Sequence, residues 1–347
     1  MNLEEFNYPF NKDLIAQEPI TPRDHSRLLI LDRKTQKIEH KYFYQIVDYL
    51  SENDILVFND TKVIPAKMVG KIEGSQKEKE ILLVRPKDNS QEFSFSKWPT
   101  QWQILGKNLK GGQILTFSQK LKGIIKEKKG YETIIEFNQK GERLKKLIFS
   151  LGKAPLPPYI KNPSKKSLFK YQTTYAKKLG SIAAPTAGFH FTKALLEKIK
   201  KKGTSVVFLT LHIGLGTFLP IKTEKIEEHK MEEEYFILTS KIAKKLNEAK
   251  KNKKRIIAVG TTVVRVLETC EKNGSLIPQK GWTNLFIYPG YQFKFVDALI
   301  TNFHLPKSTP LLLVCAFANK ELIFKAYEEA QKLNYRFYSF GDAMFII

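Results

Sequence analysis

Short apolar runs alternate with helical segments in two parts of the chain, and this alternation constrains the fold more than any other feature. In the first part, a helix-like stretch at 42–50 lies between the apolar runs 28–31 and 55–58. The same rhythm resumes from Pro155 onward, where the expected elements are 193–202, 205–211, 241–250, 255–259, 262–271, 285–288, and helices near 311 and over 322–333. Alternation of this kind is typical of an α/β fold, so we predict a mixed sheet flanked by helices.

Residues 62–150 follow a different pattern. Short strand-like runs are separated by Gly, Asn, Asp and Lys turns, and the runs are 80–84, 113–117, 121–125 and 131–137. Many short strands with little helix indicate a small barrel or sandwich. A chain of 347 residues also exceeds the usual size of a single core. We therefore predict that an inserted β-barrel-like domain, 62–150, interrupts a discontinuous α/β catalytic domain formed by 1–61 and 151–347.

The chain is strongly basic, with 58 Lys and Arg against 35 Asp and Glu and a net charge of +23. A polyanionic partner would explain this balance, because lysines that neutralise phosphates release counterions. A lysine-rich solvated surface explains it equally well. The segment 62–150 carries 19 basic and nine acidic residues, so it is our first candidate for an RNA-facing surface.

Cysteine content and hydropathy indicate where such a chain would act. Cys270 and Cys315 lie in apolar helical patterns, and neither has a Cys or His partner at metal-ligand spacing, so we expect no metal site. The apolar run 311–318 is much shorter than the roughly 20 residues of a membrane span. Residues 1–10 contain two acids and lack a signal-peptide pattern. We expect a cytoplasmic protein with no membrane contact.

Polar side chains come directly after several of the predicted strands, where open α/β sheets place their ligand sites. Taken one at a time, such residues have ordinary structural explanations, such as a turn or a helix cap. Their recurrence at successive strand ends favours a shared pocket. The residues are Asn59, Asp60, Thr61, His212, Thr217, Thr261, Thr262, Arg265, Asn302 and His304.

Two glycine-containing stretches are further candidates for a ligand site. Gly214 and Gly216 follow a strand, but the third glycine, the downstream acid and the immediate helix of a dinucleotide-binding loop are missing. The segment 183–191 sets His190 among small and aromatic residues without helical or strand periodicity. Small residues allow close backbone approach to a flat ligand, and a tight crossing between elements is the competing explanation.

Nine stretches of the chain, in this order, look like the signatures of one family. They are RDHSRLL (23–29), LVFNDTKVIPAK (56–67), PLPPYI (155–160), 171–191 with AAPTAGFHF, LHIGLGTF from Leu211, 229–235, GTTVVRVLE from Gly260, YPGYQFKFVDALITNFHLPKST from Tyr288, and YRFYSFGDAMFI (335–346). Over nearly its whole length the chain resembles the S-adenosylmethionine:tRNA ribosyltransferase-isomerase family.

The resemblance implies a transferase-isomerase of tRNA queuosine biosynthesis. Such an enzyme transfers and isomerises the ribosyl part of S-adenosylmethionine onto 7-aminomethyl-7-deazaguanine at the tRNA wobble position. The product is epoxyqueuosine tRNA, and adenine and methionine leave. S-adenosylmethionine is a co-substrate, and the resemblance implies no prosthetic group and no metal. We expect a monomer whose partners are S-adenosylmethionine and tRNA carrying the precursor base.

The resemblance, with the strand-end pattern, also selects the site residues. As catalytic candidates we take His190, His212, His229, Glu234, Arg265 and Asp342. As substrate-binding candidates we take Arg27, Asn59, Thr61, Thr186, Thr217, Thr261, Thr262, Asn302 and His304. The chain departs from the family pattern at Glu232, where many relatives have a second histidine, and at Lys62 and Lys67, where arginines are often seen.

Two other functions remain open from the sequence. An RNA methyltransferase that uses S-adenosylmethionine would release S-adenosylhomocysteine, and the weak glycine pattern counts against it. A basic RNA-binding factor without catalysis would not turn over the cofactor at all, and the polar strand ends count against it.

Overall fold

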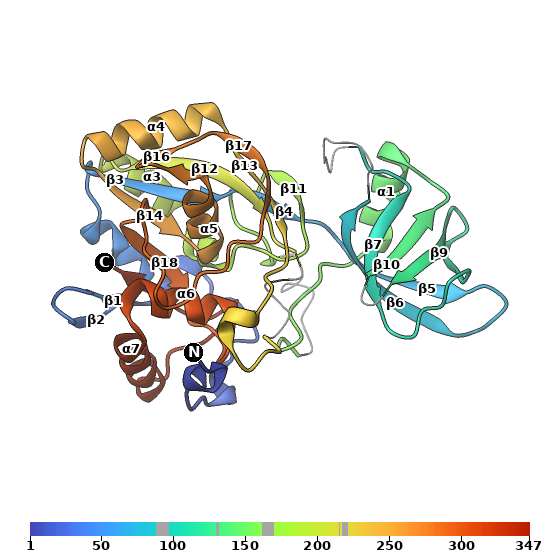
Figure 1. Cartoon of the computed structure of the whole chain (residues 1–347), viewed down its shortest axis with the longest axis horizontal. Coiled ribbons are helices and arrows are strands. Elements are labelled where there is room, and N and C mark those ends of the chain that lie inside the picture. The colour runs from blue at the N-terminus through green and yellow to red at the C-terminus, as the bar shows by residue number, and fades with distance from the viewer. Residues whose placement is uncertain (88–96, 130–131, 162–169, 215, 217–220) are drawn as a thin grey trace. The chain divides into compact units, whose positions relative to one another are not determined.

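The computed structural model describes residues 1–87, 97–129, 132–161, 170–214, 216 and 221–347 (Figure 1). These residues form two compact units. The sheet unit comprises Met1–Thr61, Pro158–Lys177 and Pro185–Ile347, and the barrel unit comprises Lys62–Pro157 and Lys178–Ala184.

A nine-stranded mixed sheet forms the centre of the sheet unit. Its strands, in spatial order, are β17 (Gln279–Thr283), β13 (Glu234–Leu238), β12 (Ser205–His212), β3 (Asp54–Asn59), β14 (Arg255–Val259), β18 (Ala298–Asn302), β19 (Ala343–Ile346), β1 (Arg27–Leu31) and β2 (Ile38–Tyr42). The central strands β12, β3, β14 and β18 run parallel to one another. Parallel strands are covered on both faces, which explains why every residue of β3 is buried. Their carboxyl ends therefore meet at one edge, which we call the sheet edge.

Helices pack on the sheet through stripes of apolar residues. They are α3 (Lys193–Lys201), α4 (Ser240–Lys251), α5 (Thr261–Cys270), α6 (Thr309–Ala318) and α7 (Lys320–Lys332), with 3₁₀ turns that include η4 (Phe43–Tyr49) and η5 (Thr186–His190). The α3 helix begins where the Thr192 hydroxyl accepts a hydrogen bond from the Leu195 amide at 3.1 Å, and it buries Leu195, Leu196 and Ile199. Among the described residues, no helix combines the length and apolar character that crossing a membrane requires.

The barrel unit is a closed antiparallel barrel of six strands. In order around the barrel they are β10 (Glu132–Phe137), β7 (Gln101–Gly106), β6 (Glu78–Pro86), β5 (Lys67–Ile72), β8 (Ile114–Ser118) and β9 (Leu121–Lys129). Closure removes the exposed strand edges that an open sheet of this size would present. Helix α1 (Gly141–Leu151) follows, and a two-stranded sheet pairs β11 (Lys178–Ser181) with β4 (Thr61–Val63).

The predicted fold class is confirmed, because a mixed sheet with helices accompanies a closed β-barrel. One predicted strand is wrong. Residues 285–288 are irregular, and the strand lies earlier, at β17. The Leu285 carbonyl, which a strand would use in a ladder, accepts a hydrogen bond from Arg265 Nε at 2.9 Å. The helix-like stretch 42–50 is a 3₁₀ helix, and helix α1 was not predicted.

Candidate active site

Four predicted polar positions come together at the sheet edge because their strands are parallel. Asn59 ends β3, His212 ends β12 and Asn302 ends β18. Gly260, which follows β14, has a φ of +95° and leads directly into helix α5. A glycine adopts this backbone conformation without the steric cost that a side chain would add. The chain therefore passes from strand to helix within one residue, and Thr261 begins the helix.

Asn59 connects three elements at this edge. Its Oδ1 accepts hydrogen bonds from the backbone amides of Leu211 (3.0 Å) and Thr61 (3.1 Å). Its Nδ2 donates to the Leu211 carbonyl at 2.9 Å and to the Thr262 hydroxyl at 3.3 Å. The side chain is fully buried. Asn59 thus fixes β3, β12 and α5 relative to one another, which is a supporting role for the site.

His212 is held in one orientation by its neighbours. The Thr61 hydroxyl lies 2.8 Å from His212 Nδ1. The ring is nearly parallel to that of Tyr235, with an interplanar angle of 9° and a centroid distance of 6.3 Å. The residue is 8% exposed. An imidazole oriented in this way, at the end of a central strand, meets the geometric requirement for a proton-transfer group.

Glu234 and Arg265 form a buried ion pair between β13 and α5. The other carboxylate oxygen of Glu234 accepts the Gly214 amide at 2.8 Å. Arg265 also donates to the carbonyls of Leu285 (2.9 Å) and Thr283 (3.2 Å). Arg265 is 6% exposed and Glu234 is 1% exposed. The pair therefore anchors the segment at Gly214 and the irregular chain after β17.

A small cavity adjoins this ion pair at the start of α5. It is lined by Met231, Thr261, Thr262, Arg265, Leu285, Phe286, Ile287, Thr309, Pro310 and Leu313. His229 lies beside it, with its ring centroid 5.0 Å from that of Phe286. Burial lowers the pKa of His229, and the Glu232 carboxylate partly offsets that shift. The departure noted at Glu232 therefore places a negative charge near His229.

His190 lies in a second network with Asn302. Asn302 Nδ2 is 3.1 Å from His190 Nε2, and Ser26 Oγ is 2.7 Å from His190 Nδ1. The Thr186 hydroxyl donates to Asn302 Oδ1 at 2.9 Å, which orients the amide so that its NH₂ faces the histidine. His190 Nε2 is then an acceptor, and Nδ1 carries the proton and donates to Ser26. Burial, with nearby Arg336 and Arg23, lowers the pKa of His190 to about 3, so the ring is neutral near pH 7.

Asp342 organises the turn that precedes β19. Its oxygens accept the backbone amides of Arg27 (2.9 Å) and Arg336 (2.8 Å). Arg27 Nε lies 3.8 Å from Asp342 Oδ2, and the Arg27 guanidinium sits 3.9 Å above the Tyr335 ring. The geometry supports a positioning role for Asp342, since both of its oxygens hold backbone groups.

His304 Nε2 lies 2.8 Å from the Thr301 hydroxyl, and burial lowers the pKa of His304 to about 3. Thr217 lies outside the described residues. A Cβ on Gly260 would lie 3.6 Å from that of Ala187, so η5 adjoins the start of α5. The hydrogen bonds around His190 and those around Asn59 therefore lie in neighbouring parts of the sheet unit. Among the described residues, no group of three His, Cys, Asp or Glu side chains could hold a metal ion.

Sequence reasoning missed Ser26 and Arg336, which complete the networks of His190 and Asp342. Ser26 lies within the RDHSRLL stretch, but nothing in its local pattern marks it as a histidine partner 164 residues away. Such a pairing depends on how β1 and η5 meet in the fold.

The Thr61–His212 contact leads to a first prediction. We expect Thr61→Val to lower turnover by about 3- to 10-fold, because a hydrogen bond of about 0.5–1.5 kcal/mol orients the ring. Thr204→Val is the matched control: Thr204 lies next to the other end of β12, and its hydroxyl donates to the Ser51 carbonyl at 2.8 Å. Steady-state kinetics would measure both. Equal losses in the two variants would contradict an orienting role for Thr61.

Comparison with known proteins places the chain in a family. A family model described as queuosine biosynthesis protein matches residues 3–346. Proteins named S-adenosylmethionine:tRNA ribosyltransferase-isomerase match over the full length of both chains: 48% identity in Caldanaerobacter subterraneus subsp. tengcongensis and 46% in Halothermothrix orenii. The crystal structure of an S-adenosylmethionine tRNA ribosyltransferase from Thermotoga maritima is 37% identical, covers 99% of this chain and 100% of its own, and superposes with a TM-score of 0.57. The chain belongs to the queuosine biosynthesis protein family.

Proposed function

We propose that this protein is an S-adenosylmethionine:tRNA ribosyltransferase-isomerase of queuosine biosynthesis. The observation that carries the proposal is the full-length match to relatives of that name at 46–48% identity. The enzyme moves the ribosyl group of S-adenosylmethionine onto the aminomethyl group of 7-aminomethyl-7-deazaguanine in tRNA and isomerises it. Epoxyqueuosine tRNA, adenine and methionine are the products.

The reaction requires three kinds of protein group. The sulfonium acidifies the hydrogens of the adjacent 5′-carbon, so a positioned base removes one of them. Departure of adenine needs a proton donor near the purine, and the sugar oxygens need hydrogen-bond donors. The tRNA amine must be neutral to attack as a nucleophile. Oriented side chains at the sheet edge supply groups of these kinds.

We assign the roles by geometry. His212 is our candidate for proton transfer, because Thr61 fixes its ring at the end of β12. Thr261 and Thr262 are our candidates for hydrogen bonds to the substrate, because they stand at the start of α5, directly after β14. Arg265 and Glu234 hold that wall in place. Neutral His190 adds no positive charge that would repel the sulfonium.

We propose that the barrel-containing segment folds as an inserted domain and that its basic surface faces tRNA. Lys126 on β9 is one of its lysines, and Glu136 on β10 pairs with it at 2.8 Å, so part of this charge is neutralised within the barrel. We further propose that the enzyme acts as a monomer in the cytoplasm and uses S-adenosylmethionine as co-substrate without a prosthetic group.

A product analysis tests the activity. Incubation with S-adenosylmethionine and tRNA carrying the precursor base should release one adenine and one methionine for each tRNA modified, because ribosyl transfer breaks the glycosidic and the sulfonium bonds. Chromatography with mass detection would quantify all small products. The control is tRNA that lacks the precursor base, which should release neither. Stoichiometric S-adenosylhomocysteine would identify a methyltransferase instead, and no turnover would favour a binding protein.

A further inference from the structure

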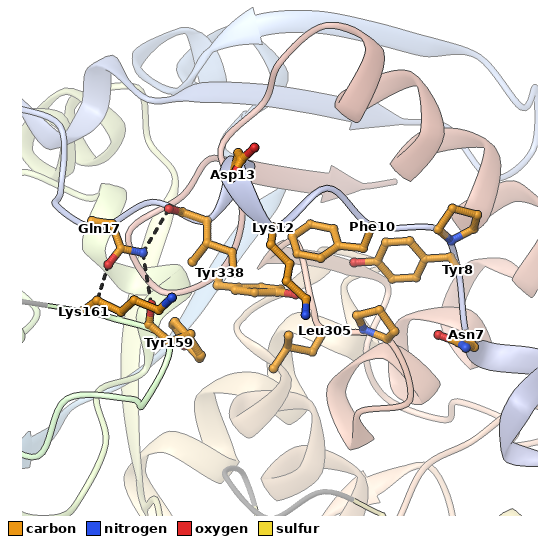
Figure 2. A pocket seen from close by; sticks show the side chains of 13 residues that line it. Asn7, Tyr8, Phe10, Lys12, Asp13, Gln17, Tyr159, Lys161, Leu305 and Tyr338 are labelled. Atoms are coloured by element: carbon orange, nitrogen blue, oxygen red, sulfur yellow. Dashed lines mark hydrogen bonds between the residues drawn. The ribbon is translucent and has the colours of Figure 1, made fainter.

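A large cavity of about 1000 Å³ lies in the sheet unit, and none of the residues assigned above lines it (Figure 2). Four aromatic side chains from three segments form its lining in succession. Ring centroids are 5.9 Å apart for Tyr8 and Phe10, 5.2 Å for Phe10 and Tyr338, and 5.0 Å for Tyr338 and Tyr159. We call this cavity the aromatic pocket. Its size is within the range of pockets that hold small organic groups, roughly 300–1000 Å³.

The rim of the aromatic pocket is polar and held in a defined position. The Gln17 side chain donates to the Tyr159 carbonyl at 3.0 Å and accepts the Lys161 amide at 2.7 Å, which joins the N-terminal segment to 159–161 (Figure 2). Lys12 and Lys161 bring two ammonium groups to the rim, and Asp13 brings one carboxylate. Among the described residues, neither Lys12 nor Lys161 forms a salt bridge. The rim is therefore suited to an anionic group.

Tyr338, in the wall of this pocket, has an unfavourable backbone conformation and an unfavourably buried hydroxyl. Its φ is +69°, in the left-handed region that a bulky side chain rarely adopts. Its hydroxyl is buried and has no hydrogen-bond partner within the part of the chain that the structure describes, which costs about 1–3 kcal/mol. The surrounding turn holds the Tyr338 backbone in place, since its amide donates to the Phe303 carbonyl at 3.2 Å and its carbonyl accepts the Gly341 amide at 2.9 Å. Strained conformations of this kind persist where the surrounding contacts enforce them, and they are found most often at functional sites such as ligand-binding sites.

We propose that the aromatic pocket binds an unstacked nucleobase of the tRNA substrate, with the adjoining phosphates at Lys12 and Lys161. Aromatic side chains stack on the flat faces of single-stranded bases, and lysines contact the backbone between them. S-adenosylmethionine fits this rim less well. It carries a sulfonium and an ammonium against one carboxylate, so the two lysines repel its net positive charge. The proposal rests on the proposed function, since it takes tRNA as the substrate.

Equilibrium binding to precursor tRNA tests the stacking. Tyr159→Leu removes the ring and keeps an apolar side chain, and loss of one stacked base should weaken tRNA binding about 5- to 100-fold. Tyr159→Phe keeps the ring and loses only the 2.6 Å contact between the Tyr159 hydroxyl and Ser339 Oγ, so its affinity should stay near that of the wild type. S-adenosylmethionine affinity, measured by calorimetry without tRNA, should be unchanged in both variants and shows that the protein is folded.

The salt dependence of binding tests the lysines. The plot of log affinity against log salt has a negative slope. For Lys12→Gln/Lys161→Gln this slope should become shallower by about 1.4, since each phosphate contact to a single strand contributes roughly 0.7 to its steepness. The matched control is Lys193→Gln/Lys201→Gln, which removes the same charge from exposed positions on α3 and should keep the slope. Equal slopes for the two double variants would overturn the phosphate contacts.

The outcomes separate this inference from the proposed function. If the wild type releases adenine and methionine but Tyr159→Leu binds tRNA normally, the activity stands and the pocket assignment fails. If Tyr159→Leu loses S-adenosylmethionine affinity and keeps tRNA affinity, the pocket holds the adenosyl group and the RNA assignment is overturned. If the wild type shows no turnover while Tyr159→Leu still weakens tRNA binding, the pocket assignment stands and the proposed function fails.

Discussion

Arg265→Ala should lower turnover by about 100-fold or more, since small displacements of catalytic groups cost about that much. The same change should destabilise the sheet unit by about 3–5 kcal/mol, because it leaves the Glu234 carboxylate buried without its partner. Arg265 and Glu234 are almost fully buried and bonded to each other, and Arg265 also holds the Leu285 and Thr283 carbonyls. Both effects therefore come from one cluster, and thermal unfolding with steady-state kinetics would measure them.

A double variant separates stability from turnover. Replacing a buried ion pair by apolar residues of similar size is often neutral for stability, so Arg265→Met/Glu234→Met should regain much of the stability lost in Arg265→Ala. Turnover should remain low, because Glu234 would no longer hold the Gly214 amide. Glu227→Gln is the control for charge, since Glu227 pairs with the N-terminus at the surface, where solvent screens the pair, and the change should leave stability near that of the wild type. Recovery of turnover in the double variant would contradict a role for this cluster in the active site.

Much of the sheet edge could be predicted because two local signals coincide there. Apolar runs mark β3, β12 and β14 as buried strands, and a polar residue follows each run. Parallel pairing then brings those ends together, as the hydrogen bonds of Asn59 to Leu211 and Thr262 illustrate. Neither signal depends on contacts between distant segments, so sequence reasoning finds both.

Other features depend on tertiary contacts and left no local pattern. Residues 285–288 are apolar, and this pattern predicts a strand. In the fold, Arg265, 20 residues earlier, donates a hydrogen bond to the Leu285 carbonyl, and the segment is irregular. The aromatic pocket combines the N-terminal segment with Tyr159 and Tyr338. Each of its rings alone resembles an ordinary core residue. Only the packing of these segments shows that they line a cavity.

Mild acid should destabilise the region around η5 and β18. The folded state holds the pKa of His190 near 3, whereas the ordinary value is 6.5, so the unfolded chain binds a proton that the folded chain does not. Stability from this group is therefore complete above about pH 6.5 and is lost as the pH falls toward 3. At pH 5 the loss from His190 alone should be roughly 2 kcal/mol. His304 shifts in the same direction through burial and adds to the effect.

Hydrogen exchange of peptides covering 186–191 and 298–304, corrected for the intrinsic pH dependence, would measure this loss between pH 7.5 and 5. The range lies above the ordinary carboxyl pKa values, so carboxylates that are stabilised in the folded state contribute little within it. His190→Gln is the matched variant, because glutamine keeps a donor and an acceptor for Ser26 and Asn302 but does not titrate. Its protection should be lower at pH 7.5 and should fall much less on acidification than that of the wild type. An equal acid-induced loss in both proteins would show that His190 is not the group that titrates, and the sensitivity would then rest with His304, which the same comparison on His304→Gln would test.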